Sequence, residues 1–340
     1  MNSHTHTSLK RYIPENQYRF YYEHLSNEGK NIYDKLLAGY LEHLRSISVK
    51  ASNMNEVWDI HEKVCYDVPE LFFIKSVKGS YNSLLSKVTI YPEYRFDFDT
   101  CEVLLIRMSE VIEPVVQKIT SLSEREKVKQ IHDFLTRKVT YKDIYAPYSH
   151  EAPGALIYGI AVCEGISKSF KYVCDRASLD SVVIIGNAYD SVNNPTSNGG
   201  HAWNIVFVDS LPYHIDVTFD YSLSDSNLIR YDYFLLSDSQ IHPDHAFEQL
   251  ILCNTEYEYY EKINCYAKSK RELQAMARFM LSPMDPLVIK MPSFVDDINV
   301  VAEILIATVS SSVSLVHGFQ FNISMTYNPS RMIFQFNLSE

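Results

Sequence analysis

The chain has 340 residues, 46% of them hydrophobic, and a formal net charge of −11 at pH 7. This length and hydrophobic fraction are sufficient for one large core or for two to three smaller ones. The charged residues are spread along the chain and form no basic stripe of the kind that binds phosphates, so nucleic acid is not an expected partner.

Neither a signal peptide nor a membrane span is expected. The N-terminal sequence lacks the apolar core of about 7–15 residues that a signal peptide carries, and no stretch reaches the roughly 18 apolar residues of a membrane-spanning helix. We therefore expect a cytoplasmic protein without membrane contact. His4 and His6 lie in a polar tail, which indicates a disordered end more often than a metal site.

Six cysteines are scattered through the chain without a CxxC pair or a zinc-finger spacing. They are Cys65, Cys101, Cys163, Cys174, Cys253 and Cys265. In a chain of this size without an export signal, they are expected to be reduced thiols. Any one of them could be a nucleophile, and most should be inert.

The hydrophobic pattern predicts three modules, of which the first, residues 1–119, is a small α+β module. Its predicted elements are, in chain order, helices at 32–44 and 54–65, strands at 70–77 and 86–94 joined by a turn at 79–82, and a helix at 102–120 that Pro114 should kink or split. The third module, residues 256–340, is a second small α/β or α+β unit. Its predicted elements are a helix at 268–280, a strand at 286–290, a helix at 295–309 and a hairpin of strands at 319–327 and 331–338.

The second module, residues 120–255, contains the residues suited to chemistry. Ser123 and Glu126 form a possible capping box at the start of an amphipathic helix. Another helix is predicted to begin at or just after Cys163, with Cys174 on its apolar stripe. Strands are predicted at 181–186, 201–208, 213–219 and 233–236.

Three residues of this module could form a nucleophilic site. At the first turn of a helix, the unpaired N–H groups and the helix dipole favour the thiolate form of Cys163, and an adjacent imidazolium favours it further. Gly165 would allow close approach of backbone and substrate, and the N–H of Cys163 could stabilise an oxyanion. His201 at a strand start would take the proton of the Cys163 thiol and later return it, and Asp216 on the next strand would orient the His201 ring.

The hairpin between these two strands poses a geometric problem. His201 and Asp216 lie opposite each other only if the hairpin is centred between positions 208 and 209, whereas the turn-like residues Asp209–Pro212 are centred two positions later. A shift of the centre by two positions offsets the pair by four residues, about 13 Å at about 3.3 Å per residue. A bulge or an asymmetric loop would have to absorb this offset.

Four stretches, GIAVCEGISKSFKYVCDRA, GHAWNIV, YHIDVTFD and YFLLSD, resemble the catalytic core of the transglutaminase-like superfamily in its bacterial type. The resemblance covers roughly residues 120–245. It implies an α+β, papain-like core in which a helix carrying the cysteine packs on an antiparallel sheet, with a Cys-His-Asp triad. It also implies acyl chemistry on an amide or thioester through an acyl-enzyme. The sequence departs from many relatives at Ala161, where they carry glycine.

Each candidate also has a structural interpretation. Considered alone, Cys163 would be interpreted as a structural thiol. Its motif context with His201 and Asp216 favours a nucleophile instead. Trp203 shares the strand face of His201 and could shield the imidazole or belong to the core. Candidates for a second oxyanion donor are Tyr158 and His150.

Three acidic residues near these candidates have ordinary interpretations. Glu164 lies in a first helical turn, where the dipole already favours a carboxylate. Asp209 and Asp220 are predicted to be turn and edge residues.

The sequence favours an active cysteine enzyme that cleaves or transfers an acyl group from a peptide or protein substrate, with hydrolysis favoured over cross-linking. Such chemistry requires no metal and no organic cofactor, because the thiolate, the imidazole and backbone donors suffice. The alternative is a non-enzymatic module that binds a peptide or partner on an inactive scaffold. The sequence does not indicate the oligomeric state.

Overall fold

The computed structural model describes residues 8–143, 148–189, 199–278, 286–292, 298–317 and 322–339. The chain forms two compact units: unit 1 comprises Met1–Ile185 and His201–Pro212, and unit 2 comprises Gly186–Gly200 and Tyr213–Glu340. Among the described residues, no helix combines the length and hydrophobicity needed to cross a membrane. His4 and His6 lie outside the described residues.

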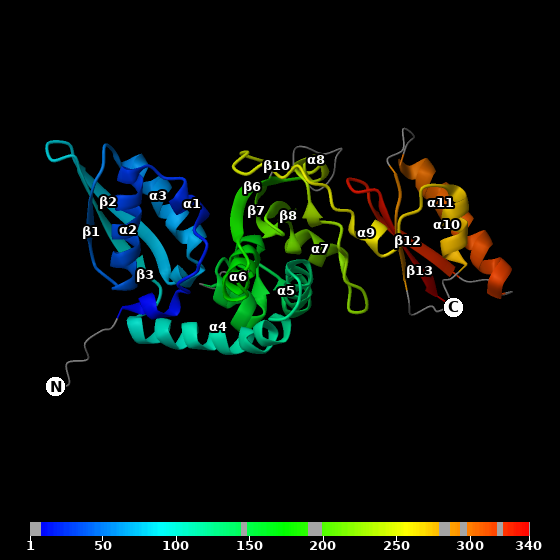
Figure 1. The fold of residues 1–340 in the computed structure, drawn as a ribbon, viewed down its shortest axis with the longest axis horizontal. Helices are drawn as coiled ribbons and strands as arrows, with labels where there is room; N and C mark the ends of the chain where they lie inside the picture. The colour runs from blue at the N-terminus through cyan, green and yellow to red at the C-terminus, as the bar shows by residue number, and fades with distance from the viewer. Residues whose placement is uncertain are drawn as a thin grey trace. The chain divides into compact units, whose positions relative to one another are not determined.

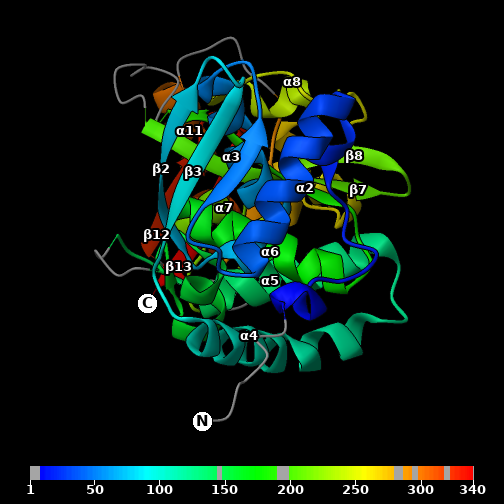
Figure 2. The same ribbon diagram turned by 90° about the vertical axis from the view of Figure 1, so that its left-hand side faces the viewer.

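The N-terminal part of unit 1 is an α+β structure around a three-stranded antiparallel sheet of order β1-β3-β2. Its elements are η1 Leu9–Tyr12, α1 Phe20–Glu23, α2 Asn27–Leu41, β1 Ile47–Lys50, α3 Met54–Asp67, η2 Pro69–Leu71, β2 Ile74–Asn82, β3 Lys87–Tyr94 and α4 Phe98–Ile119. Figure 2 shows β2 and β3 side by side. The predicted helices and both strands are confirmed, strand β1 was missed, and α4 continues through Pro114 as one helix.

The predicted turn at 79–82 is wrong, because these residues end strand β2. Asn82 pairs with Lys87, and its side chain accepts a hydrogen bond from the Leu85 N–H, so the turn begins at Asn82. Gly79 serves close packing instead: a Cβ atom there would lie 2.8 Å from the Met54 sulfur on α3. A glycine in a strand can therefore mark a neighbouring helix rather than a turn.

The second part of unit 1 packs helices on a sheet. Its elements are α5 Glu124–Lys138, β4 Thr140–Tyr141, the π-helical turn η3 Gly154–Tyr158, β5 Ile160–Ala161 and α6 Cys163–Arg176. The Ser123–Glu126 capping box is confirmed, as is the start of a helix at Cys163. Figure 1 shows α5 and α6 beside the long helix α4.

The central sheet has five strands in the order β10-β6-β7-β8-β9. Their bounds are β6 Ser181–Ala188, β7 Gly199–Val208, β8 Leu211–Ile215, β9 Phe234–Leu236 and β10 His245–Phe247. On the unit 1 side, the Asn204 side chain of β7 donates to the Val182 carbonyl of β6 and to the Ser167 carbonyl of α6. The expected α+β fold, with the cysteine-bearing helix against an antiparallel sheet, is therefore confirmed.

Two predictions around the β7–β8 hairpin are corrected. The turn consists of Asp209 and Ser210 alone, both with positive φ (53° and 64°), as hairpin turns of the primed types require. The hairpin is therefore centred between residues 209 and 210, one position from the centre that would place His201 opposite Asp216. The expected offset between these two residues falls from four residues to two. The predicted strand at 213–219 ends at Ile215, and α7 Val217–Leu223 follows, so Asp216 is a helix N-cap residue rather than a strand residue.

The elements of the C-terminal part of unit 2 are α8 Asp238–Ile241, α9 Tyr259–Lys262, α10 Lys270–Ala277, β11 Leu287–Lys290, α11 Ile298–His317, β12 Asn322–Asn328 and β13 Ile333–Ser339, with strand order β11-β13-β12. From α10 onward, this part has the predicted element order, whereas the short helices α8 and α9 before it were not predicted. Buried polar side chains join this sheet to the segment before β9: Arg230 donates to Gln335, and Arg331 donates to the Asp232 carbonyl.

Replacing Lys171 by methionine is expected to destabilise unit 1 by about 3–5 kcal/mol, because it leaves a buried charge uncompensated. The Lys171 ammonium is fully buried on α6 and lies 3.0 Å from the Asp175 carboxylate, whose pKa burial has already raised to about 6. The free energy of unfolding in urea measures the loss. The exposed pair of Lys63 and Asp59 on α3 is the matched control, and Lys63→Met should cost about 0.5 kcal/mol or less.

Candidate active site

Cys163 is the first residue of α6 and is half-buried. The N-cap residue, Val162, supplies no side-chain cap, so no capping side chain competes for the first N–H groups of the helix. Gly165 allows a close approach, as expected, but to the chain's own backbone: a Cβ atom there would lie 2.4 Å from the Ser149 carbonyl oxygen. The first turn of the helix that carries the thiol therefore packs closely against the backbone of residues 149–151.

Tyr141, which sequence reasoning missed, lies at the thiol. It pairs with Ala161 in the short parallel ladder of β4 and β5, two residues before the cysteine. Its hydroxyl group is hydrogen-bonded to the Cys163 side chain and to the Cys163 backbone N–H. Burial and then the neighbouring sulfur raise the pKa of Tyr141 to about 12, so the phenol stays protonated at neutral pH. No local pattern in the sequence pairs residues 22 positions apart.

Glu164 is engaged in a partly buried ion network in which Lys168 is buried and His150 is exposed. Lys168 lies 2.8 Å from Glu164 and 2.9 Å from Glu151, and the Nδ1 atom of His150 lies 3.2 Å from Glu164. Burial acts to raise the pKa of Glu164, but Lys168 and His150 outweigh it and hold that pKa below its ordinary value. His150, an expected oxyanion candidate, is thus bonded to a carboxylate, and the network fixes the turn that follows the cysteine.

Tyr158, the other expected oxyanion candidate, is 41% exposed at the end of η3. Its ring stacks on Tyr148 with centroids 4.0 Å apart, and the guanidinium carbon of Arg107 lies 6.0 Å from the ring centroid. Gly159, with φ of +67°, turns the chain directly afterwards into β5. The structure thus places Tyr158 in an aromatic surface cluster.

His201 lies near the start of β7 and is buried, with 8% of its surface exposed. Its ring stacks on Trp203 at a centroid distance of 5.8 Å and an interplanar angle of 20°. Trp203 is itself 1% exposed, so it both shields the imidazole and belongs to the core. The expectation that these two side chains share a strand face is confirmed.

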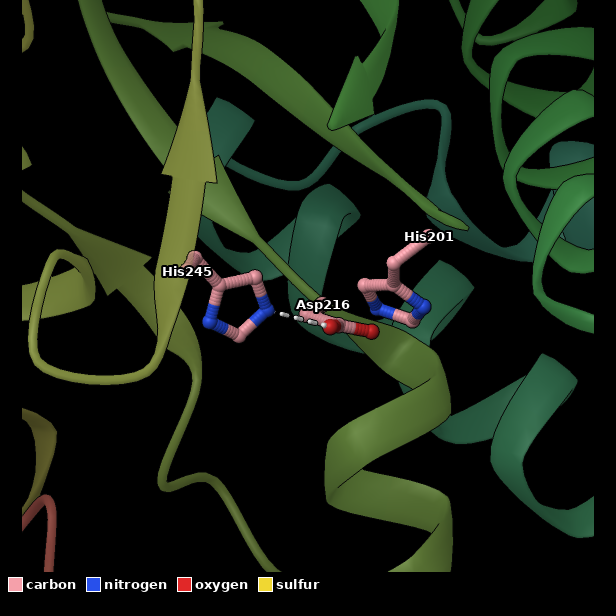
Figure 3. Close-up of side chains that lie close together, drawn as sticks. All are labelled: His201, Asp216 and His245. Carbon is pink, nitrogen blue, oxygen red and sulfur yellow. Dashed lines mark hydrogen bonds and ion pairs between the residues drawn. The ribbon is translucent and has the colours of Figure 1, made fainter. Parts of the chain in front are cut away.

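Asp216 is fully buried in unit 2, where its carboxylate is held on both oxygens. Oδ1 accepts hydrogen bonds from the N–H groups of Thr218 (2.8 Å) and Phe219 (3.0 Å), as an N-cap aspartate does. Oδ2 lies 3.0 Å from Nε2 of His245, the bond drawn in Figure 3. Asp216 therefore has a fixed orientation before any ligand is considered.

His245 and Asp220 are the residues of unit 2 whose environments the sequence did not reveal. His245 lies at the start of β10 between Asp216 and Asp244, and the only sequence signal for it is the Asp-His pair that follows the YFLLSD motif. Asp220 was predicted to be a turn or edge residue, but it is fully buried and accepts a hydrogen bond from the Tyr233 N–H. Asp209 is a turn residue, as predicted.

Within unit 2, His214, Asp238 and Cys253 form a buried cluster whose potential metal-ligand atoms all lie within 4.8 Å of one another. Hydrogen bonds account for this arrangement: the Asp238 carboxylate lies 2.8 Å from His214 Nε2 and accepts from Gln249 and from the Cys253 N–H. Burial lowers the pKa of His214 to about 4, so its ring is neutral at pH 7.

Taken together, the fold is that of a mixed helix-and-sheet protein in which a helix begins with a cysteine and packs on an antiparallel sheet. Residues 111–216 match the model of the transglutaminase-like superfamily, which confirms the resemblance inferred from the motifs. The matched range contains Cys163 and His201 and ends at Asp216. Cys163 and His201 belong to unit 1 and Asp216 to unit 2, so their joint action belongs to the proposal that follows.

Two solved structures are among those similar to this chain. One is described as a "Putative Cysteine Protease from Cytophaga hutchinsonii" (15% identity, TM-score 0.27, 42% of this chain and 61% of that chain covered). The other is described as a TGase (14% identity, TM-score 0.30, 58% of this chain and 60% of that chain). The chain thus spans less than two thirds of either structure. No curated protein matches it.

Proposed function

We propose that this protein is a cysteine-dependent enzyme of acyl transfer or amide hydrolysis, with Cys163 as nucleophile, His201 as proton carrier and Asp216 as the carboxylate that orients His201. The observation that carries the proposal is the position of Cys163 at the N-terminus of α6, where the N-cap residue supplies no side-chain cap, inside the range that matches the transglutaminase-like model. The substrate class is an amide or thioester of a peptide or protein. No metal or organic cofactor takes part in these steps.

The reaction proceeds in two steps. The Cys163 thiolate attacks the carbonyl carbon, a C–S bond forms, and the carbonyl oxygen becomes an oxyanion that the Cys163 N–H stabilises. The tetrahedral intermediate collapses when the C–N bond breaks, and the leaving amine takes a proton from the His201 imidazolium. Water then attacks the acyl-enzyme and its proton passes to His201; the C–S bond breaks, which gives the acid and restores the Cys163 thiolate. An amine attacking in place of water breaks the same C–S bond and gives the transferred amide.

Tyr141 favours one alternative function, a binding module without turnover. Its hydroxyl is bonded to the same Cys163 N–H that an oxyanion would need. In the enzyme, the incoming carbonyl oxygen takes the place of this hydroxyl, and the displaced phenol, like the candidates Tyr158 and His150, is a possible second donor. In a non-enzymatic module, the hydroxyl would stay in place and the thiol would never be acylated.

Acylation by p-nitrophenyl acetate tests the proposal and separates the two functions. The enzyme is expected to release one equivalent of p-nitrophenolate in a burst and to carry one acetyl group on the peptide that contains Cys163, as detected by mass spectrometry. Cys163→Ala should lose both signals. If the wild-type protein shows neither an acetyl group on Cys163 nor release of p-nitrophenolate that Cys163→Ala abolishes, the enzymatic function is rejected in favour of the binding module.

Cys65 provides a matched control for this experiment. Like Cys163, it is half-buried, and its sulfur lies 3.8 Å from Nδ1 of His61. Burial raises the pKa of Cys65 to about 12, which keeps it a thiol at neutral pH. Cys65→Ala should therefore leave the burst unchanged, because proximity to a histidine without a helix N-terminus does not make a nucleophile.

A further inference from the structure

The Asp216 carboxylate is the centre of a buried hydrogen-bonded chain that sequence reasoning did not find. Its Oδ2 atom lies 3.0 Å from Nε2 of His245, and Nδ1 of the same ring lies 2.7 Å from the Asp244 carboxylate. The Tyr233 hydroxyl donates to the other oxygen of Asp244, and Asn328 of β12 donates to the Tyr233 hydroxyl at 3.2 Å. Every member of this chain belongs to unit 2.

Both ring nitrogens of His245 face carboxylate oxygens, and a histidine donates from both nitrogens only as an imidazolium. Burial acts to lower the pKa of His245, but its bonds to Asp216 and Asp244 outweigh burial and raise that pKa above its ordinary value. Both contacts therefore favour the imidazolium form of the buried ring. In that form, His245 and the two carboxylates together carry one negative charge, so the negative charge that a triad aspartate contributes is not cancelled.

Aromatic packing holds the His245 ring in this place. The Phe219 ring lies 4.7 Å from it and the Tyr233 ring 5.6 Å from it, measured between centroids. The backbone of His245 pairs with Ala188 in the ladder of β10 and β6. Phe219 also donates its N–H to Asp216. The same residue therefore bonds the carboxylate through its backbone and packs against the His245 ring through its side chain.

We infer that His245, anchored by Asp244, is a positioning residue that sets the orientation of the Asp216 carboxylate. This inference rests on the proposed function, in which Asp216 orients His201. Two backbone N–H groups fix Oδ1, and His245 fixes Oδ2, so the carboxylate cannot rotate about its terminal bond. A carboxylate accepts about four hydrogen bonds, so these three are compatible with a fourth from the His201 ring. Without His245, two buried carboxylates would face each other with no cation between them.

A double-mutant cycle on p-nitrophenyl acetate turnover tests the inference. His245→Gln is expected to lower kcat about tenfold with KM within about twofold, because His245 acts through Asp216 rather than on the substrate. In an Asp216→Ala background, the same substitution should change kcat by less than about twofold, because no carboxylate remains to be oriented. An equal loss of kcat in both backgrounds, in variants that are folded under the assay conditions, would overturn the inference.

Two further variants keep the test decisive. If His245→Gln does not fold, Asp244→Asn is used in its place; it weakens the anchor and should lower kcat about threefold in the wild-type background only. His214→Gln removes another fully buried histidine of unit 2, one that pairs with Asp238 instead of Asp216, and should leave kcat unchanged. Turnover that persists in Cys163→Ala would reject the proposed function and this inference together. Turnover that requires Cys163, with effects of His245→Gln and Asp216→Ala on kcat that are independent of each other, would reject the inference alone.

Discussion

His201→Gln is expected to lower turnover of an acyl substrate by about 10²- to 10⁴-fold, the contribution that a positioned general base makes. Glutamine retains hydrogen-bonding capacity and much of the volume of histidine, so it preserves packing against Trp203. It cannot carry a proton between the thiol, the leaving amine and water. The loss should therefore appear in kcat.

The same variant has a second signature that needs no substrate. An ordinary thiol with a pKa of about 8.5 is alkylated about 75-fold faster at pH 8 than at pH 6, because its thiolate fraction changes by that factor. In the proposed site, an imidazole that takes up the thiol proton speeds alkylation at low pH, so the wild-type ratio should be smaller than that of His201→Gln. Iodoacetamide labelling followed by mass spectrometry of the Cys163 peptide measures both ratios. A wild-type ratio as large as that of His201→Gln would mean that the two side chains form no ion pair.

Local sequence patterns were sufficient for the helices around the site. The start of α6 at Cys163 follows from an apolar stripe at helical spacing, and α5 follows from the capping box of Ser123 and Glu126. Both signals are contained within about one or two helical turns. The stacking of His201 on Trp203 follows equally from the alternation of a strand.

The hairpin and the residue after it could not be predicted in this way. Asp209 and Ser210 form the turn in left-handed conformations without the glycine that usually signals such turns. Val217 and Phe219 alternate like strand residues, but they lie in a helix of only seven residues, too short to show a helical period. The N-cap role of Asp216 is visible only once that helix is known.

The contacts that complete the candidate site are long-range. Tyr141 reaches Cys163 through the pairing of two strands of two residues each. His245 reaches Asp216 from 29 positions away, through a strand of three residues at the edge of the central sheet. Elements this short carry no periodicity, so a single sequence contains no pattern that brings these side chains together.

Asp216→Ala is expected to lower turnover by about 10²- to 10³-fold and to reduce stability by about 3–5 kcal/mol, two effects with separate causes. The stability loss comes from the Oδ1 bonds to Thr218 and Phe219 that cap α7, and from the buried His245 ring, which loses one of its two carboxylate partners. The loss of turnover comes from the missing carboxylate that the proposal assigns to the His201 ring. Urea unfolding measures the first effect, and kcat on p-nitrophenyl acetate measures the second.

Asp216→Asn separates the two effects, because asparagine is as good an N-cap residue as aspartate. It should recover the part of the stability that the cap contributes, about 1 kcal/mol, since its side-chain oxygen can still accept from the Thr218 N–H. Its turnover should fall by an intermediate factor of about 10- to 100-fold, because an amide oxygen still orients an imidazole but adds no charge to stabilise the imidazolium. Wild-type turnover in Asp216→Asn and Asp216→Ala alike would leave Asp216 with only its capping role, and the orienting carboxylate would have to be sought elsewhere.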